Sequence, residues 1–239
     1  MRRAVTLLFL LLPLAGAATP AAPAHPCVRG NELWFDTADG VKLVGHRFGG
    51  VRPGTKTTVV LAHQAEADLC QWVPYARKLA AQGYFVFPFD FRGHGFSKGF
   101  IRGPRLPGDV AAAVRAVRGL GAKTVVVVGA SMGGIASLVA AANIRPPLAG
   151  VVSLSAPQAY IGMDALKTAP RLTVPVLYAA GRDEPAGRYD FPGAARAMFA
   201  ATASSDKKVE IFSSDAHGIA LLQSAPSLQS LLADFLRAR

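Results

Sequence analysis

The sequence predicts an α/β fold, in which a mostly parallel sheet is flanked by helices on both faces. Short apolar runs rich in β-branched residues alternate along the chain with longer segments whose apolar residues recur at helical spacing. This is the pattern of parallel strands joined by crossover helices. Of the 239 residues, 51% are apolar and only 17% are charged, so the chain can bury a large core. The sequence has no internal repeat, and we expect a single domain.

The first element expected is an antiparallel hairpin at the start of the sheet. Residues 33–35 and 41–48 alternate polar and apolar side chains around Asp39 and Gly40, and Asp-Gly is a common hairpin turn. The next run, residues 57–62, is short and largely β-branched, with apolar residues on both faces. Such a run is typical of a strand buried in the centre of a sheet.

Helices and strands are expected to alternate through the rest of the chain. Over residues 69–82, apolar side chains recur at helical spacing, and the pattern stops at Gly83, which predicts a helix that ends there. The same reasoning predicts strands over residues 84–89, 124–128, 151–154, 174–180 and 208–212, helices over residues 107–118, 131–143 and 193–203, and a final amphipathic helix that runs to the end of the chain.

The N-terminal segment has the composition of a cleavable targeting sequence. Arg2 and Arg3 precede an apolar run over residues 4–14, and the small residues 15–17 fit a cleavage site. A membrane anchor is the alternative, but the run is shorter than the ~20 residues that a spanning helix needs. We expect a secreted or periplasmic protein with no stable membrane span after cleavage. The expected division is a signal peptide at residues 1–17, a linker at residues 18–30 and a single domain at residues 31–239.

The charge and the cysteine count limit the classes of partner and cofactor. The chain has 26 Lys and Arg against 15 Asp and Glu, a net charge of +11, and loss of Arg2 and Arg3 with the signal peptide leaves 24 against 15, or +9. These charges are dispersed, which favours a basic soluble surface over a nucleic-acid-binding stripe. Two cysteines cannot form a zinc site of four thiolates. We expect no nucleic-acid partner, no metal and no other cofactor.

Cys27 and Cys70 are the two cysteines, and both would survive signal cleavage. In an oxidising compartment they are expected to form one disulfide. The alternative is that Cys70 is a buried apolar residue and Cys27 a free thiol in a mobile tail.

Ser131 is the candidate nucleophile. It lies at the centre of a Gly-x-Ser-x-Gly pattern, from Gly129 to Gly133, between a predicted strand and a predicted helix. A serine on such a tight turn has a strained backbone, and the two glycines let the strand and the helix pass closely. The turn exposes the serine hydroxyl near the N-terminus of the helix, where developing negative charge is favoured. A phosphate-binding turn is the alternative, but no Lys follows as in a P-loop, and Gly-x-Gly-x-x-Gly is absent.

His217 is the candidate base, because it follows the last predicted strand and comes after Ser131 in the chain. An acid is then needed to fix the tautomer of the imidazole and to stabilise the imidazolium. Asp183 and Glu184 follow the strand at residues 174–180, and either carboxylate could serve. The order is therefore serine, acid, histidine.

These motifs resemble those of the α/β-hydrolase superfamily, and the resemblance runs from about residue 31 to the end. The segment Asp90-x-Arg92-Gly-His94-Gly-x-Ser97 is similar to a loop whose role in that family is structural. The resemblance therefore implies the α/β-hydrolase fold and gives His94 no catalytic chemistry.

The resemblance also implies roles for residues around the nucleophile. His63 resembles the histidine of a His-Gly turn that precedes the oxyanion-hole residue, with Gln64 here in place of the glycine. The backbone N–H groups of Ala65 and Met132 would then form the oxyanion hole, and His63 would not take part in the chemistry. The family pattern Gly-x-x-Asp-Pro places Glu184 at the acid position, and Asp183 serves if the loop is shifted by one residue.

The function predicted is that of an exported, carboxylesterase-like serine hydrolase. It would act on a small-molecule ester through an acyl-enzyme on Ser131, with His217 as base. A peptidase or thioesterase on the same triad is one alternative, and a non-catalytic binding protein with this fold is another.

A short insert is expected to leave the site shallow and open. About 18 residues separate the strand that ends near Ser155 from the strand that starts at Val174, where many relatives carry a helical cap. Tyr160, Ile161 and Met163 lie in this insert and could line an acyl pocket, although core packing is the more common role of such residues.

Overall fold

A computed structural model describes residues 25–52, 55–184, 187 and 189–239. The predicted signal peptide at residues 1–17 and most of the predicted linker lie outside the described residues. No helix among the described residues is long and apolar enough to cross a membrane.

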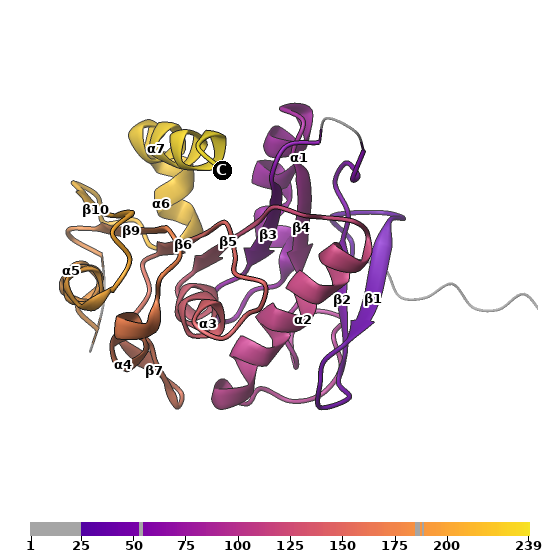
Figure 1. Cartoon of the computed structure of the whole chain (residues 1–239), viewed down its shortest axis with the longest axis horizontal. Coiled ribbons are helices and arrows are strands. Elements are labelled where there is room, and N and C mark those ends of the chain that lie inside the picture. Colours follow the sequence, from indigo (N-terminus) through magenta and orange to yellow (C-terminus); the bar gives the residue numbers. More distant parts are fainter. Residues whose placement is uncertain (1–24, 53–54, 185–186, 188) are drawn as a thin grey trace, which may run out of the picture.

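The sheet has eight strands in the order β1-β2-β4-β3-β5-β6-β9-β10 (Figure 1). β1 pairs antiparallel with β2, β2 pairs antiparallel with β4, and the remaining neighbours are parallel. The predicted α/β class and the leading hairpin are therefore confirmed. The strands are β1 (Glu32–Asp36), β2 (Lys42–His46), β3 (Thr58–Ala62), β4 (Phe85–Phe89), β5 (Val125–Ala130), β6 (Gly150–Leu154), β9 (Val176–Gly181) and β10 (Lys207–Phe212).

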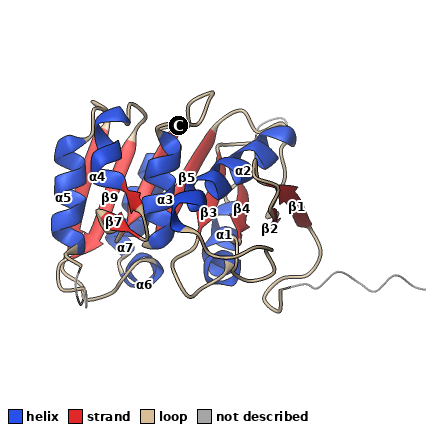
Figure 2. Cartoon of the chain, turned by 90° about the horizontal axis from the view of Figure 1, so that it is seen from below, coloured by secondary structure: helices blue, strands red, loops and turns tan. Residues whose placement is uncertain are grey.

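Helices cover both faces of the sheet, as Figure 2 shows, with α2, α3 and α5 on one side and α1, α6 and α7 on the other. The first helix is preceded by a 3₁₀ turn over Leu69–Trp72. The helices are α1 (Val73–Ala81), α2 (Leu106–Gly119), α3 (Met132–Ala141), α4 (Ala165–Thr168), α5 (Phe191–Ala201), α6 (Ile219–Ser224) and α7 (Pro226–Arg237).

Two large apolar clusters form most of the core, one on each face of the sheet. Alternate residues of β3 enter opposite clusters: Val60 contributes to one, and Val59 and Leu61 contribute to the other. Every residue of β3 is buried, as expected for a central strand whose side chains alternate between two covered faces.

The C-terminal segment ends in an amphipathic helix, as predicted, but it contains a second, shorter helix that the sequence did not predict. It forms α6 and α7, which are separated at Ala225, whose φ of −111° and ψ of 96° are extended. The cause is Pro226, because the proline ring disfavours helical backbone in the residue before it and fits the first position of the next helix.

The insert between β6 and β9 contains elements that the sequence did not predict. It forms a two-stranded ribbon of β7 (Ala159–Tyr160) and β8 (Met163–Asp164), then α4 and a 3₁₀ turn over Ala169–Arg171. The insert is small, in agreement with the expectation that no large cap is present. Met163 belongs to the core at 3% exposure, whereas Ile161 is 43% exposed.

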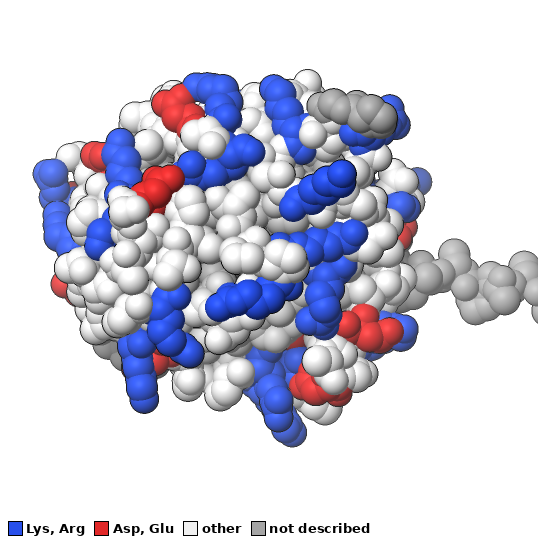
Figure 3. Space-filling view, viewed as in Figure 1, with Lys and Arg blue, Asp and Glu red and all other residues white. Residues whose placement is uncertain are grey.

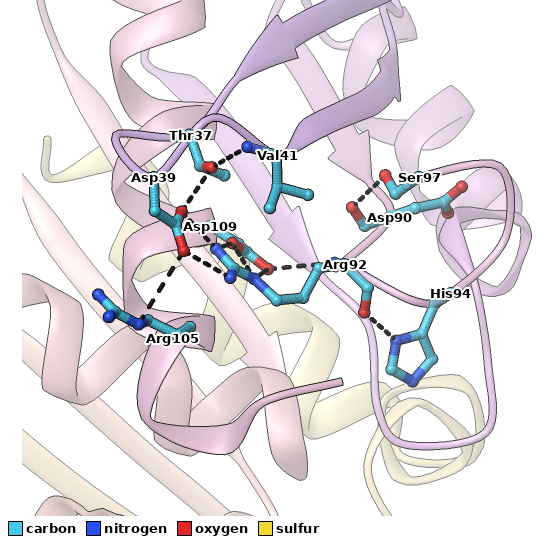
Figure 4. A network of polar contacts seen from close by, with 9 residues as sticks. All are labelled: Thr37, Asp39, Val41, Asp90, Arg92, His94, Ser97, Arg105 and Asp109. Atoms are coloured by element: carbon cyan, nitrogen blue, oxygen red, sulfur yellow. Dashed lines mark hydrogen bonds and ion pairs between the residues drawn. The ribbon is translucent and has the colours of Figure 1, made fainter. Parts of the chain in front are cut away.

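A buried ion cluster around Arg92 joins three parts of the fold (Figure 4). The Arg92 guanidinium contacts Asp109 of α2 at 2.6 Å and Asp39 of the hairpin turn at 2.8 Å. Its hydrogen bonds to Asp39 lower the pKa of that carboxyl well below its ordinary value. Burial raises the pKa of the Asp109 carboxyl, against the opposing effect of Arg92. The cluster supports the structural role that the family resemblance implied for this loop.

The described end of the predicted linker packs against the domain. Cys27 and Cys70 form a disulfide with Cα atoms 5.7 Å apart. His25 is buried, and its Nε2 lies 2.6 Å from Asp90. Burial alone would lower the pKa of His25, but the hydrogen bond and charge of Asp90 raise it overall. Residues 25–30 are thus held by a covalent bond and by a buried polar contact.

Basic side chains are spread over much of the face shown in Figure 3, with acidic side chains between them. This distribution agrees with the dispersed charge of the sequence.

Candidate active site

Ser131 lies at the tight turn between β5 and α3. It is the residue just before α3, and its φ of 50° and ψ of −114° lie in a region that non-glycine residues rarely adopt. Its N–H donates to the carbonyl of Leu154 at the end of β6, at 2.8 Å. The strained serine turn that the sequence predicted is present.

The two glycines of the turn are required by close packing. A Cβ atom at Gly129 would collide with the carbonyl of Gly133, and a Cβ atom at Gly133 would collide with the carbonyl of Ala62 at the end of β3. The start of α3 therefore lies directly against β5 and β3, and side chains at these two positions would push them apart.

Glu184 and His217 form the polar pair of the site. Glu184 follows β9 and His217 follows β10, and the carboxylate Oε2 lies 2.7 Å from Nδ1 of the imidazole. The Glu184 side chain is fully buried, while that of His217 is 26% exposed. A histidine whose Nδ1–H donates to a carboxylate presents its other ring nitrogen, Nε2, as a proton acceptor.

Asp183, the other candidate acid, is placed differently. It is exposed, and its backbone N–H donates to the carbonyl of Ser214 at 3.0 Å. The structure thus brings Glu184, and not the adjacent carboxylate, to His217.

Ser155, directly after β6, connects the acid and the histidine loop. Its hydroxyl donates to Oε1 of Glu184 at 2.7 Å and accepts the N–H of Gly218 at 2.9 Å. Oε1 of Glu184 also accepts the N–H of Gly181. Three donors therefore hold the buried carboxylate, the arrangement that a buried charge requires.

The loop that carries His217 lies against the serine turn. A Cβ atom built on Gly218 would be 3.4 Å from the Cβ of Ala130, the residue before Ser131. The N–H of Ile219 donates to Oε1 of Gln64 at 3.5 Å. The ends of β3, β5 and β10 thus meet at one edge of the sheet, where functional residues of parallel sheets gather.

The two residues expected to supply the oxyanion donors follow β3 and β5. Met132 is the first residue of α3, so its N–H is one of the four that have no acceptor within the helix. Ala65 lies in the turn after β3, next to Glu66 with a φ of 58°. The contact between Gly133 and the end of β3 holds these two segments side by side.

The other histidines after early strands have structural partners. His63 is fully buried; its Nδ1 lies 2.8 Å from the carbonyl of Gln64, and its Nε2 accepts the N–H of Phe91 at 3.1 Å. Burial lowers the pKa of His63 to about 4, so it is neutral near pH 7. Nδ1 of His94 lies 3.1 Å from the carbonyl of Arg92.

An aromatic row leads away from His217. The ring of Phe191 lies 4.5 Å from the imidazole, Tyr189 stacks on Phe191 at 5.8 Å, and Tyr160 lies 6.2 Å from Tyr189. A hollow of about 440 Å³ lies over the β7–β8 ribbon, with Tyr160, Tyr189 and Met163 in its lining.

Sequence reasoning missed two residues of this site. Ser155 carries no motif, because one serine after a strand has no distinctive pattern. Gln64 was noticed as a departure from the glycine of the resembled turn, but its contact with Ile219 depends on a residue 155 positions away and has no sequence signal.

One group of possible metal ligands is present among the described residues: His25, Cys27 and Cys70. Because the two cysteines form a disulfide, neither offers a thiolate to a metal.

Comparisons with known proteins agree with this architecture. The family described as alpha/beta hydrolase fold matches residues 57–211. No curated protein matches the sequence.

Several solved structures have a similar fold. An esterase from Pyrococcus furiosus has a TM-score of 0.73 at 20% identity, with 87% of this chain and 91% of that chain covered. An enol-lactonase from Burkholderia xenovorans has a TM-score of 0.71 at 18% identity, covering 86% and 100%. An esterase from a Rhodococcus species has a TM-score of 0.70 at 17% identity, covering 87% and 99%. At these identities the likeness concerns the fold.

Proposed function

The chain belongs to the α/β hydrolase family, and from this premise we propose that it is a serine hydrolase that cleaves carboxylic esters of small molecules. Ser131 is the nucleophile, His217 the general base and Glu184 the acid that orients the imidazole. The observation that carries the proposal is the 2.7 Å contact between Glu184 and His217, on a loop that lies against the strained turn of Ser131.

The reaction has two steps. Ser131 Oγ attacks the carbonyl carbon of the ester while Nε2 of His217 takes its proton, and the N–H groups of Ala65 and Met132 stabilise the oxyanion. His217 then protonates the departing alcohol, which leaves an acyl group on Ser131. A water molecule activated by His217 releases the acid and restores the serine.

The buried carboxylate supports the assignment of the acid to Glu184. As the reaction proceeds, His217 becomes an imidazolium, and a negative charge held beside Nδ1 in a low-dielectric environment stabilises it. Asp183 is exposed and has its backbone in contact with Ser214, so water would screen its charge.

The hollow beside the aromatic row is proposed to take the apolar part of the ester. Tyr160, Tyr189 and Met163 are among the residues that line it, and side chains of this kind pack well against apolar groups.

We also propose that the protein is exported. The basic and apolar N-terminal segment supports this, as does the Cys27–Cys70 disulfide, because disulfides persist in oxidising compartments.

Labelling with a fluorophosphonate tests the proposed nucleophile. We expect one label per wild-type chain, located on Ser131 by peptide mass, and none on Ser131→Ala. An unlabelled wild-type protein would instead favour a non-catalytic binding protein. A panel of p-nitrophenyl esters with increasing acyl length, together with a thioester and a peptide anilide, then decides between esterase, thioesterase and peptidase.

A further inference from the structure

We propose that Ser155 is a positioning residue that sets the geometry of the Glu184–His217 pair. The inference rests on the proposed function, in which that pair activates Ser131. Ser155 does not touch the reacting atoms in this scheme, and its effect is transmitted through the acid and the histidine loop.

The hydroxyl of Ser155 makes two hydrogen bonds, one to each side of the pair. A hydroxyl has one proton and two lone pairs, so donation to Oε1 of Glu184 at 2.7 Å directs a lone pair toward the N–H of Gly218, which it accepts at 2.9 Å. One oxygen atom therefore fixes both the carboxylate and the residue directly after His217. With Oε1 held in this way, Oε2 is left to face the imidazole.

The backbone of Ser155 gives a second, independent observation. Its φ is 51°, in the left-handed region, which glycine occupies at much lower cost than serine. Such strain persists where the surroundings enforce it, and it often marks a functional position. The N–H of Ser155 donates to the carbonyl of Ala179 at 2.7 Å, which holds this residue against β9, the strand that leads to Glu184. A serine at this place has a role that the backbone conformation alone does not explain.

Ser153, two residues earlier on β6, lacks these features. It is also buried, at 2% exposure, but its hydroxyl has no hydrogen-bond partner among the described residues. Ser153→Ala therefore removes a buried serine hydroxyl two residues earlier in the chain, one that bonds to neither the acid nor the histidine loop, and it serves as the matched control.

The expected consequence is a loss in the chemical step. A carboxylate that can rotate, or a histidine loop that can shift, places the imidazole away from the serine hydroxyl for part of the time. Substrate binding does not depend on this pair, so the loss should fall on kcat more than on KM.

The test compares Ser155→Ala, Ser155→Gly and Ser153→Ala with the wild-type protein in ester hydrolysis. We expect both Ser155 variants to lose roughly 10- to 100-fold in kcat, as for a lost hydrogen bond to a charged group, with KM within about twofold. Ser153→Ala should stay within about threefold of wild type. The glycine variant relieves the backbone strain, so a purely conformational role for Ser155 would leave its activity intact, and that result would overturn the proposal.

A spectroscopic measurement follows the pair without any substrate. The Nδ1 proton that His217 shares with Glu184 gives a proton resonance far downfield, which is assigned by its loss in Glu184→Gln. We expect it in the wild-type protein and in Ser153→Ala, and its loss or broadening in both Ser155 variants.

The two measurements separate the outcomes. A wild-type protein that neither hydrolyses esters nor takes the label contradicts the proposed function, and the downfield resonance then decides the role of Ser155 alone. Where the wild-type protein is active, the role of Ser155 is overturned if both Ser155 variants keep the downfield resonance. It is also overturned if both variants keep the wild-type kcat. If the ring proton exchanges too fast to be seen in the wild type, the kinetic comparison decides.

Discussion

Ser131 has a φ of 50°, a conformation that costs a non-glycine residue about 1–3 kcal/mol. Ser131→Ala keeps the Cβ atom and removes only the hydroxyl, so we expect the turn to keep its conformation. We expect Ser131→Ala and His217→Ala each to lower ester turnover by about 10³-fold or more. Urea unfolding should show a change in the free energy of unfolding of less than about 1 kcal/mol. Turnover by Ser131→Ala near the wild-type rate would remove this serine from the mechanism.

The two neighbouring carboxylates form a matched pair for testing the acid. Glu184→Gln replaces a buried acceptor 2.7 Å from Nδ1 of His217, whereas Asp183→Asn changes an exposed side chain. We expect the first change to lower kcat by about 10²- to 10⁴-fold, since the imidazolium loses its counter-charge, and the second to lie within about twofold of wild type. Steady-state kinetics on one ester checks both. A larger loss in Asp183→Asn would move the acid by one residue.

The sequence narrowed the proposed acid to Asp183 and Glu184, and the resemblance to the α/β-hydrolase pattern favoured Glu184. Both follow β9, and the choice depends on which side chain turns inward. Glu184 does so because its Oε1 accepts the N–H of Gly181 and the hydroxyl of Ser155, and the second of these contacts comes from another strand. By contrast, Ser131 was predicted from local sequence alone, because the two glycines around it are needed by the turn itself.

Among the elements, the loop after β4 depends on the Arg92 cluster (Figure 4). Asp109 of α2 is fully buried, so loss of the guanidinium would leave an unpaired carboxylate in the core. We expect Arg92→Met to lower the free energy of unfolding by about 3–5 kcal/mol, measured by urea unfolding. Arg105 is exposed and lies 4.0 Å from Asp39, so Arg105→Met should change the free energy of unfolding by less than about 0.5 kcal/mol. Equal effects of the two substitutions would contradict a structural role for the cluster.

The elements that the sequence predicted well are those whose pattern is local. The apolar runs of β3 and β5 are buried on both faces, and their composition indicates this directly. The ribbon of β7 and β8 was missed because two-residue strands have no periodicity. The short helix α6 was not predicted, although Pro226 gives a local signal for the break between it and α7.

At the scale of the whole molecule, residues 25–30 are attached to the domain by His25 and Cys27. His25 lies 2.6 Å from Asp90, and the carboxylate of Asp90 also accepts the N–H of Leu69 and of Phe96. The described residues before β1 therefore pack, through His25, on the same aspartate that organises the loop after β4. The composition of this segment indicated a linker. Its packing on the domain could not be predicted, because a contact between a histidine and an aspartate 65 residues away has no signal in the local sequence.

The contact of His25 predicts a pH-dependent stability. Its pKa is raised above the ordinary value of 6.5 in the folded protein, so the folded state binds the proton more tightly than the unfolded state does. The stabilisation is therefore complete below pH 6.5 and is lost as the pH rises through the folded pKa. We expect the difference in free energy of unfolding between wild type and His25→Gln to be larger at about pH 5.5 than at about pH 8.5.

Urea unfolding of the disulfide-intact protein at both pH values measures this difference. His46→Gln is the control, because burial lowers the pKa of His46, and the sign of its pH dependence should be opposite. If the free energies of unfolding of wild type and His25→Gln differ by the same amount at both pH values, His25 is not preferentially protonated in the folded state.

The disulfide makes the same attachment covalent, and its contribution depends on the length of chain it closes. The 43-residue separation of Cys27 and Cys70 restricts the unfolded chain, which in the chain-entropy model contributes about 3–4 kcal/mol. We expect the double variant Cys27→Ser/Cys70→Ser to lose free energy of unfolding of this order in urea unfolding. Its kcat on esters should stay within about threefold of wild type, because neither cysteine contacts Ser131, Glu184 or His217 among the described contacts. Reduction of the wild-type protein should lower its free energy of unfolding to that of the double variant. Two titratable thiols in the denatured, unreduced protein would show that the bond does not form.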